Sequence, residues 1–526
     1  RPGRPRRHLP AHPPRASPRA AMSSGTCGDV RDSVDIKKWF SAIITPDFNT
    51  LEARIRCGSD LPEEAGGYQR DPRLADVTRT MRATSNMINV PKKSRQAGEG
   101  YVKLSDQDEL PTFQQKTLWV RWFAPLGPGS IRSASLALMA TALGAGALAI
   151  PYAFSLTGVG LGLVTLFAAG MVSALSLQVL MVAARYTGLK SYAQLLELAA
   201  GSAAASLALD LTVVLNGVGA VTCILIFEGD FLPAVFKSPP CGLGGYELPR
   251  SWAVVGAALA AWPLTLPDDI AALRYVAVMV PVAVMITVLI VLCDAPALNK
   301  EVHELGPQGH VKWWDFQPLQ WLKAASIMVN AFANHQNAVP AANQLENPTV
   351  ERIVKATFNA NIMVWALLAS LGVGGYVSWA STIQGDFLLN YPAGRPEIWV
   401  CRVMLSLVVY LVLPVSILPT AKSGAQLILR LAGRGEQEIS GTVHAVSATL
   451  LLAGCTGVAL KVSDVASVIG ILGGLLASSL MFWFPAFVYV KLLWPSQPAA
   501  FRRPALAAIV FFGVTGWTSV FLGFLM

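Results

Sequence analysis

Long apolar segments separated by short polar connectors fill the chain from about residue 130 to its end. A helix needs about 20 predominantly apolar residues to cross a bilayer, so each segment of that length predicts one membrane span. The pattern therefore predicts an all-α membrane protein with about 11 transmembrane helices. The spans are expected at roughly 131–156, 159–184, 204–233, 251–267, 272–294, 319–344, 353–380, 397–420, 441–460, 464–493 and 505–525.

The first part of the chain has a different character. From Arg1 to about Leu118 it is rich in Pro, Arg, Asp and Glu and has few apolar runs. Such a segment buries too little apolar surface to fold, so residues 1–125 are predicted to form a mostly disordered cytosolic tail, a candidate site for a regulatory partner. The opening residues lack the apolar core of a secretory leader, and Met22 is a candidate start of the native protein. Residues 126–526 are predicted to be the membrane domain.

Composition agrees with this division. The 526 residues are 53% hydrophobic and only 14% charged, with a mean hydropathy of +0.48, values that are typical of a multispanning membrane protein. The net charge is +9, but the basic residues follow the predicted membrane topology and the opening segment. Net charge therefore gives no support for nucleic-acid binding.

The basic residues of the short connectors predict an orientation. With the tail inside, the cytosolic connectors carry eleven Lys and Arg residues and the outer connectors carry six. Because basic connectors stay on the cytosolic side, the N-terminus is expected in the cytosol and the C-terminus outside or in a lumen. Both the plasma membrane and a vacuolar or lysosomal membrane remain open as locations.

Two spans carry residues that interrupt helices. The first contains Gly144, Gly146 and Pro151, and the sixth contains the polar run 334–337 followed by Pro340. An interrupted helix is tolerated in hydrocarbon only where it lines a protein cavity or is repaired by neighbours. Interrupted segments at matching places in two halves of a chain indicate the substrate site of a transporter built from inverted repeats.

The order of several short motifs resembles a known family. The motifs are GAGALAIPYAF (144–154), SYAQL (191–195), NGVGAVT (216–222), GDFLP (229–233), NHQNAVP (334–340), LENPTVERI (345–353) and WVCRVMLSLVVYLVLPVSILPT (399–420). In this order and spacing, the membrane domain resembles the amino acid/auxin permease family, and within it the sodium-coupled neutral amino acid transporters.

This resemblance implies a leucine-transporter-type fold of two inverted five-helix repeats plus one added helix, working by alternating access. Spans 1 and 6 are then the broken ones. Repeat one is expected at about 130–295, repeat two at about 317–493 and the extra helix at about 505–525. The implied function is secondary active symport of an amino acid, and the resemblance to neutral amino acid transporters implies a neutral one. An amino acid sensor with the same fold and little transport is the alternative.

An amino acid is a zwitterion, and the free amides of an interrupted helix suit its carboxylate. We expect the backbone of Gly144, Ala145 and Gly146 to bind the carboxylate, with Thr141 as a side-chain contact. Phe332, Asn334 and His335 are expected to form the opposite wall. The rival interpretations are that the glycines only allow close helix packing, and that His335 is a hydrogen-bonded structural residue.

The coupling ion is predicted from a departure from the family pattern. Sodium-coupled members have an Asn before the glycine pair and a Thr in the eighth span, where this chain has Ala140 and Val412. Sodium needs several oxygen ligands and methyl groups supply none, so H+ is favoured over Na+. The candidates for ion coupling are Thr141, His335 and Ser416, the histidine because imidazole changes charge near neutral pH.

Other chemistry is not indicated. There is no nucleophile elbow, phosphate-binding loop or clustered Cys/His pattern, so no enzyme, cofactor or metal site is predicted. Glu228 and Asp230 lie toward the outer end of the third span and are expected to be solvated or paired. Cys241 and Cys293 could form a disulfide in an oxidising compartment, a pairing that the sequence leaves open.

Overall fold

The computed structural model describes residues 129–525, apart from 238–244, 268–275, 305–308, 392–394, 434–438, 463–464 and 495–498. Within these residues all regular structure is helical. The predicted tail at 1–125 and the candidate start at Met22 lie outside the described residues. So does Cys241, and its pairing with Cys293 stays a prediction.

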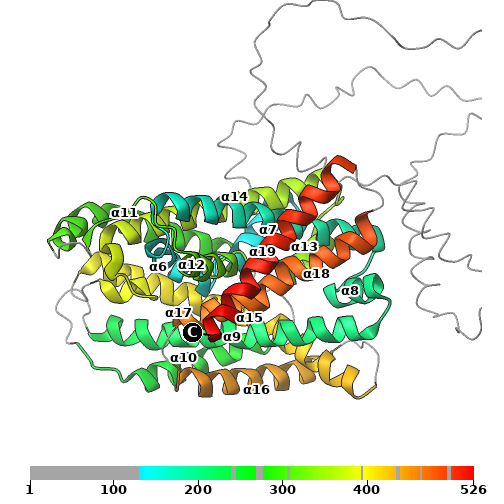
Figure 1. Cartoon of the computed structure of the whole chain (residues 1–526). Coiled ribbons are helices and arrows are strands. Elements are labelled where there is room, and N and C mark those ends of the chain that lie inside the picture. Colours follow the sequence, from blue (N-terminus) through cyan, green and yellow to red (C-terminus); the bar gives the residue numbers. More distant parts are fainter. Residues whose placement is uncertain are drawn as a thin grey trace, which may run out of the picture. The chain divides into compact units, whose positions relative to one another are not determined.

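The helices follow one another in two halves (Figure 1). The first half contains α5 (Ile131–Ala142), η1 (Ala145–Ala149), α6 (Ile150–Ser155), α7 (Val159–Thr187), α8 (Tyr192–Ala200), α9 (Ala203–Lys237), α10 (Arg250–Thr265) and α11 (Val276–His303). The second half contains α12 (Pro318–Asn330), η4 (His335–Asn337), α13 (Ala338–Gln344), α14 (Val350–Trp379), η5 (Ala380–Thr382), η6 (Phe387–Asn390), α15 (Pro396–Leu431) and α16 (Gly441–Ala459). It is completed by α17 (Val465–Ile471), η7 (Leu472–Ala477), η8 (Ser479–Trp483), α18 (Phe484–Val488) and η9 (Tyr489–Leu493), which form one span, and by the last helix, α19 (Ala499–Leu525).

Every predicted span coincides with helical structure. Eight helices of the described residues are long and apolar enough to cross a membrane, and α5 with the helical segment Gly146–Ser155 forms one further span bent by 60°. Helix α10 has 16 residues, just under the length of one crossing, and α12 and α13, of 13 and 7 residues, are each too short to cross alone. The all-helical membrane fold is confirmed, and the count of eleven stays a prediction.

The packing of the helices repeats between the two halves. The third membrane spans of the two halves, α9 and α15, pack along one another, and so do the fourth spans, α10 and α16. Helix α14 packs against the broken pair α5 and α6, just as α7 packs against the broken pair α12 and α13. Likewise α11 contacts α5, as α17 and η7 contact α12. These matched contacts are what two related five-helix units produce.

Small residues let the central helices approach closely. A Cβ placed on Gly219 would overlap Leu472 of η7, and one placed on Gly217 would overlap Thr420 of α15. Larger residues here would force α9 away from both neighbours. By contrast, Leu259, Leu450 and Trp252 expose about two thirds of their surface on α10 and α16, as lipid-facing side chains do.

Candidate substrate site between two broken helices

The first break lies between α5 and η1. Helix α5 begins at an N-cap, Ser130, whose hydroxyl accepts a hydrogen bond of 3.2 Å from the Ser133 amide, and it ends at Ala142. Gly144 is extended (φ −92°, ψ −154°), and the chain then restarts as a 3₁₀ turn that continues into α6. Pro151 occupies the first turn of α6, where its missing N–H costs little. The Gly-rich segment therefore breaks this span at the predicted place.

The second break lies between α12 and α13. Helix α12 ends at Asn330, and turns through Asn334 lead into η4 before α13 begins at Ala338. The amide of Phe332 donates to the Val329 carbonyl (3.0 Å) and that of Ala333 to the Asn330 carbonyl (3.1 Å), so the helix is not continued. This span also breaks where the sequence predicted, beside the run of polar residues.

The two breaks contact each other directly. A Cβ built on Gly146 would lie 3.0 Å from Nδ2 of Asn330 and 3.2 Å from Cα of Ala331, which is closer than ordinary van der Waals contact. Asn334, which is fully buried, donates from Nδ2 to the carbonyl oxygen of Leu138 on α5 at 3.2 Å. The absence of a side chain at Gly146 thus lets one interrupted backbone pass close against the other.

Polar atoms of the second break have no partner in the described protein. These buried atoms are Oδ1 of Asn334, Nδ1 of His335, Oε1 of Gln336 and Nδ2 of Asn337. Leaving buried donors and acceptors unpaired is costly, and native proteins seldom do so in a run of four residues. A polar ligand that reached this segment would supply the missing bonds.

Two predicted wall residues point to α7. The ring of Phe332 packs on Gly170, where a Cβ would come within 2.8 Å of Cζ. Nε2 of His335 lies 2.9 Å from Oγ of Ser176, and His335 is only 1% exposed. Both residues therefore join the second break to α7, while Asn334 joins it to α5. Their role in substrate binding stays a prediction.

The remaining candidates lie on α5 and α15. Thr141 is half-buried and donates from Oγ1 to the Leu138 carbonyl of its own helix at 2.9 Å. The carbonyl of half-buried Ser416 accepts from Oγ1 of Thr420 at 2.7 Å. A Cβ on Gly144 would have as its nearest neighbour a methyl carbon of Val412, at 4.0 Å. Val412 therefore lies beside the first break.

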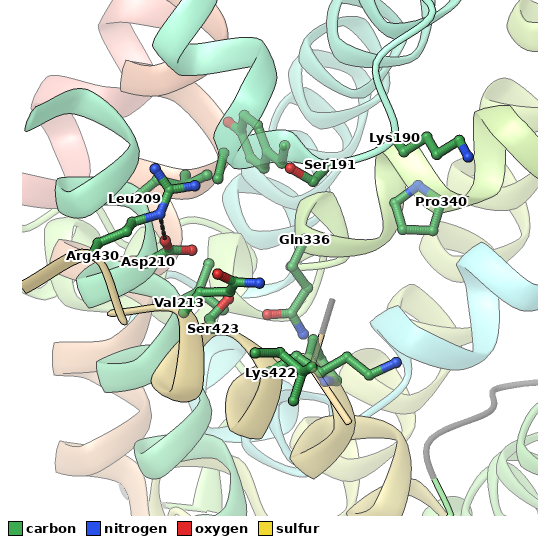
Figure 2. A pocket seen from close by; sticks show the side chains of 15 residues that line it. Lys190, Ser191, Leu209, Asp210, Val213, Gln336, Pro340, Lys422, Ser423 and Arg430 are labelled. Carbon is green, nitrogen blue, oxygen red and sulfur yellow. Dashed lines mark ion pairs between the residues drawn. The ribbon is translucent and has the colours of Figure 1, made fainter. Parts of the chain in front are cut away.

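A cavity of about 430 Å³ extends from the second break to one end of the bundle. Figure 2 shows Gln336 and Pro340 on one side of this cavity, and Asp210, Lys422 and Arg430 among the other residues that line it. The walls come from α9, α13, α15 and the segment that starts α8. This end of the bundle, where α8 lies, is called the α8 end.

Ionic contacts hold the rim of this cavity together. The guanidinium of Arg430, whose side chain is 9% exposed, lies 2.9 Å from Oε2 of Glu197 on α8 and 3.1 Å from Oδ2 of Asp210 on α9. It also hydrogen-bonds to Ser206 on α9. Figure 2 draws the Arg430–Asp210 pair. Arg430 thus ties α15 to two other helices, and Asp210 has the structural partner that a buried carboxylate requires.

The turn between α6 and α7 lies under a connecting segment. The amides of Val159 and Gly160 donate to the carbonyls of Lys312 and Trp313, at 3.1 and 2.8 Å, and the amide of Asp315 donates to the Thr157 carbonyl at 2.9 Å. Gly158 has φ +79° and would clash with this segment if it carried a Cβ. Residues 311–315 therefore cover the end of the first broken span that is remote from α5.

Of the two acids near the end of α9, one matches the prediction and one does not. Asp230, expected to be solvated or paired, forms an ion pair with Arg250 at 3.1 Å. Glu228 is neither solvated nor ion-paired with a described residue: it is 1% exposed, and its Oε2 accepts from Oγ of Ser406 at 2.6 Å. The prediction for Glu228 was wrong because helix α15 covers this face of α9.

The comparison with protein families decides the class. Residues 127–526 match the family model described as "Transmembrane amino acid transporter protein". The chain belongs to this family. Members of this family are transporters, a non-enzymatic class of protein.

Individual relatives are similar but distant. A candidate amino acid transporter named AAT1, of Toxoplasma gondii, is 31% identical over 318 residues, which cover 59% of this chain and 42% of that protein. The chain thus spans less than half the length of this relative. A candidate sodium-coupled neutral amino acid transporter of Mus musculus, numbered 11, is 25% identical over 405 residues, which cover 76% of this chain and 85% of that protein.

A solved structure of a Na+-coupled sialic acid symporter is similar over 74% of this chain and 90% of its own, with 14% identity and a TM-score of 0.45. A TM-score at this level is too low to assign a fold. The two broken spans and the repeated helix contacts of the protein itself are therefore the evidence for its architecture.

Proposed function

We propose that this protein is a secondary active transporter that carries neutral amino acids by alternating access and is coupled to protons rather than to sodium. Family membership supports amino acid transport itself. The observation that carries the finer proposal is the contact between the two broken spans, at Gly146 and Ala331, beside a run of buried polar atoms without partners.

The breaks offer both kinds of group that a zwitterion needs. The first amides of a helix have no partner within the helix, so the amides at the start of η1, at Ala145 and Gly146, are donors suited to a carboxylate. The amide of Gly144 instead donates to the Ala142 carbonyl at 2.8 Å. The carbonyl ends of α5 and α12, and Oδ1 of Asn334, are acceptors suited to an ammonium group. Binding by backbone dipoles serves any amino acid, and the side-chain contacts then set the specificity.

A neutral substrate fits the residues around the breaks. Neither 139–150 nor 331–338 contains an acidic residue, a lysine or an arginine. Leu138, Met139 and Val412 are buried beside the first break. A charged substrate side chain would find no opposite charge within these segments and would have to give up its hydration.

Coupling to protons follows from the same surroundings. A sodium ion requires several oxygen ligands, and the positions that the family resemblance assigns to sodium are Ala140 and Val412, which are 6% and 5% exposed. Val412 presents a methyl group to Gly144. This arrangement supports H+ as the coupling ion, since a proton needs only a titratable side chain.

The position of the cavity supports an inward-facing state. The cavity joins the second break to the α8 end, and the basic connectors predict that this end is cytosolic. In this orientation an amino acid held at the breaks leaves toward the cytosol, and opening of the opposite end completes the cycle.

Uptake into proteoliposomes tests the proposal. Radiolabelled neutral, acidic and basic amino acids are offered under an imposed proton gradient, an imposed sodium gradient or neither. We expect accumulation of neutral amino acids only with the proton gradient. Accumulation driven by sodium would contradict the coupling, and binding without flux would make the protein a sensor.

A further inference from the structure

A single carboxyl group lies between α9 and α15, the third membrane spans of the two halves. Glu228 of α9 is 1% exposed, and its Oε2 accepts a hydrogen bond of 2.6 Å from Oγ of Ser406 on α15. Its other oxygen, Oε1, is buried and has no hydrogen-bond partner in the described protein. Ser406 is itself 8% exposed, so the two helices enclose the pair.

No described cation compensates this carboxylate. Arg250 is held by Asp230 at 3.1 Å and by the carbonyls of Ala459 and Val462 at 3.2 and 3.3 Å. Arg402 donates to the carbonyls of Leu388 and Tyr391. Other titratable side chains on the elements packed around Glu228 include Cys223 and Asp230 on α9, Cys401 and Tyr410 on α15, Cys455 on α16 and Asp386 before η6.

A buried carboxyl group without a cation is far less costly when it is neutral than when it is ionised. In its neutral form the hydroxyl hydrogen sits on the unpartnered oxygen, and Oε2 still accepts from Ser406. Asp230 and Asp210, the other acids on α9, each form an ion pair with an arginine, so these two carboxylates are stabilised in their ionised form. Glu228 therefore differs from these acids, because no described cation stabilises its ionised form.

We propose that Glu228 is the proton-binding group through which the proton concentration at the end opposite α8 controls the opening and closing of that end during transport. This inference rests on the proposed proton-coupled function and gives it a site. With the proton bound, α9 and α15 close over the carboxyl group, as in the structure. When the Oε1–H bond breaks, water takes the proton, the electron pair stays on Oε1, and the charged carboxylate requires hydration. Ionised Glu228 thus favours separation of the two helices at this end.

The position of the pair agrees with such a role. Ser406 precedes Val412 by six residues on α15, so the carboxyl lies roughly 9 Å along the helix from the residue that faces the first break. It lies on the side of the break away from the cavity at Lys422 and Arg430. Protonation at Glu228 is therefore placed to control the end of the bundle that is remote from the α8 end.

The variant Glu228→Gln tests the proposal, because glutamine keeps the shape and the acceptor oxygen of the neutral acid and does not titrate. Amino acid exchange without a gradient is expected to continue, while the dependence of uptake on external pH is lost. Ser406→Ala removes a donor to the ionised form, so the midpoint of the pH profile is expected to move to higher pH. Asp230→Asn is the matched control and should keep the pH dependence of the native protein.

Retention of the native pH profile by Glu228→Gln would overturn the inference and leave proton-coupled transport standing. Uptake by the native protein that ignores external pH would instead contradict the proposed coupling. A second measurement needs no transport. Asp386→Asn serves as the common background, because burial raises the pKa of the Asp386 carboxyl group to about 7. In this background the infrared carbonyl-stretch band of a protonated carboxyl should be present when Glu228 is native and lost in Glu228→Gln. If both proteins show the same band, Glu228 is not the proton-binding group.

Discussion

Asn334 Nδ2 donates a hydrogen bond of 3.2 Å to the carbonyl oxygen of Leu138, and this bond joins the two broken spans. Leu138 lies within α5, four residues before its end, and Asn334 lies between α12 and α13. The two interrupted helices are therefore connected by a side chain as well as by the close approach of Gly146 to Ala331. A change at either contact should alter transport before it alters folding.

Gly146→Ala is expected to reduce amino acid uptake by about tenfold, because the new methyl group must displace the backbone of Ala331 by a few tenths of an ångström. Initial uptake rates in proteoliposomes measure the effect. Gly470→Ala is the matched control, since a Cβ at Gly470 would meet nothing within 4 Å. Equal loss of uptake in both variants would show that the contact at Gly146 has no special role.

The double variant Ala140→Asn with Val412→Thr is expected to gain uptake that sodium stimulates. The reason is that two oxygen-bearing side chains would then stand where the family resemblance places sodium ligands, one of them at position 412, beside Gly144. Uptake is compared in sodium and choline media. Val412→Ile with Ala140 retained serves as the control, and no response of the double variant to sodium would contradict the assigned positions.

Arg430→Ala is expected to destabilise the protein by about 3–5 kcal/mol, because it leaves Glu197 and Asp210 without the guanidinium that pairs with both. Thermal unfolding of the detergent-purified protein measures the change. The control Lys355→Ala removes an exposed pair with Glu351 at 3.9 Å and should cost less than about 1 kcal/mol. Similar losses of stability in the two variants would argue against a stabilising role for the buried ion pairs of Arg430.

Burial, with the nearby charge of Asp230, raises the pKa of Asp386 from 3.8 to about 7. Because the folded protein then binds more protons than the unfolded chain between these two values, stability should fall as pH rises through this window and level off above it. Apparent melting temperatures at about pH 5 and about pH 8 measure this dependence. Asp386→Asn should flatten the profile, and an unchanged profile would assign the dependence to other groups.

The sequence alone located both breaks. Gly144 and Gly146 lack a Cβ, Pro151 lacks an N–H, and four consecutive polar residues from Asn334 cannot face lipid, so these positions carry a strong local signal. The positions of the helix spans could be predicted equally well, because the thickness of the hydrocarbon layer fixes their length. Such features depend on the local chain and the bilayer.

The directions of side chains could not be predicted in the same way. Phe332 and His335 lie in an irregular segment that has no helical period, and only the structure shows that they contact α7. Glu228 lies three helical turns from Gly217 on α9, on the face that packs against α15, and this spacing was the one available signal of its burial. Burial of that face depends on a helix about 180 residues further along the chain.

Protection of a cysteine at Gly144 tests the central claim most directly. Gly144→Cys, in a chain whose native cysteines are replaced, places a thiol at the first break, where a Cβ has room. We predict that a transported neutral amino acid slows the reaction of this thiol with a small thiol reagent, whereas an amino acid that is not transported has no effect. An unchanged reaction rate at saturating substrate would contradict the proposal that the two broken spans hold the amino acid.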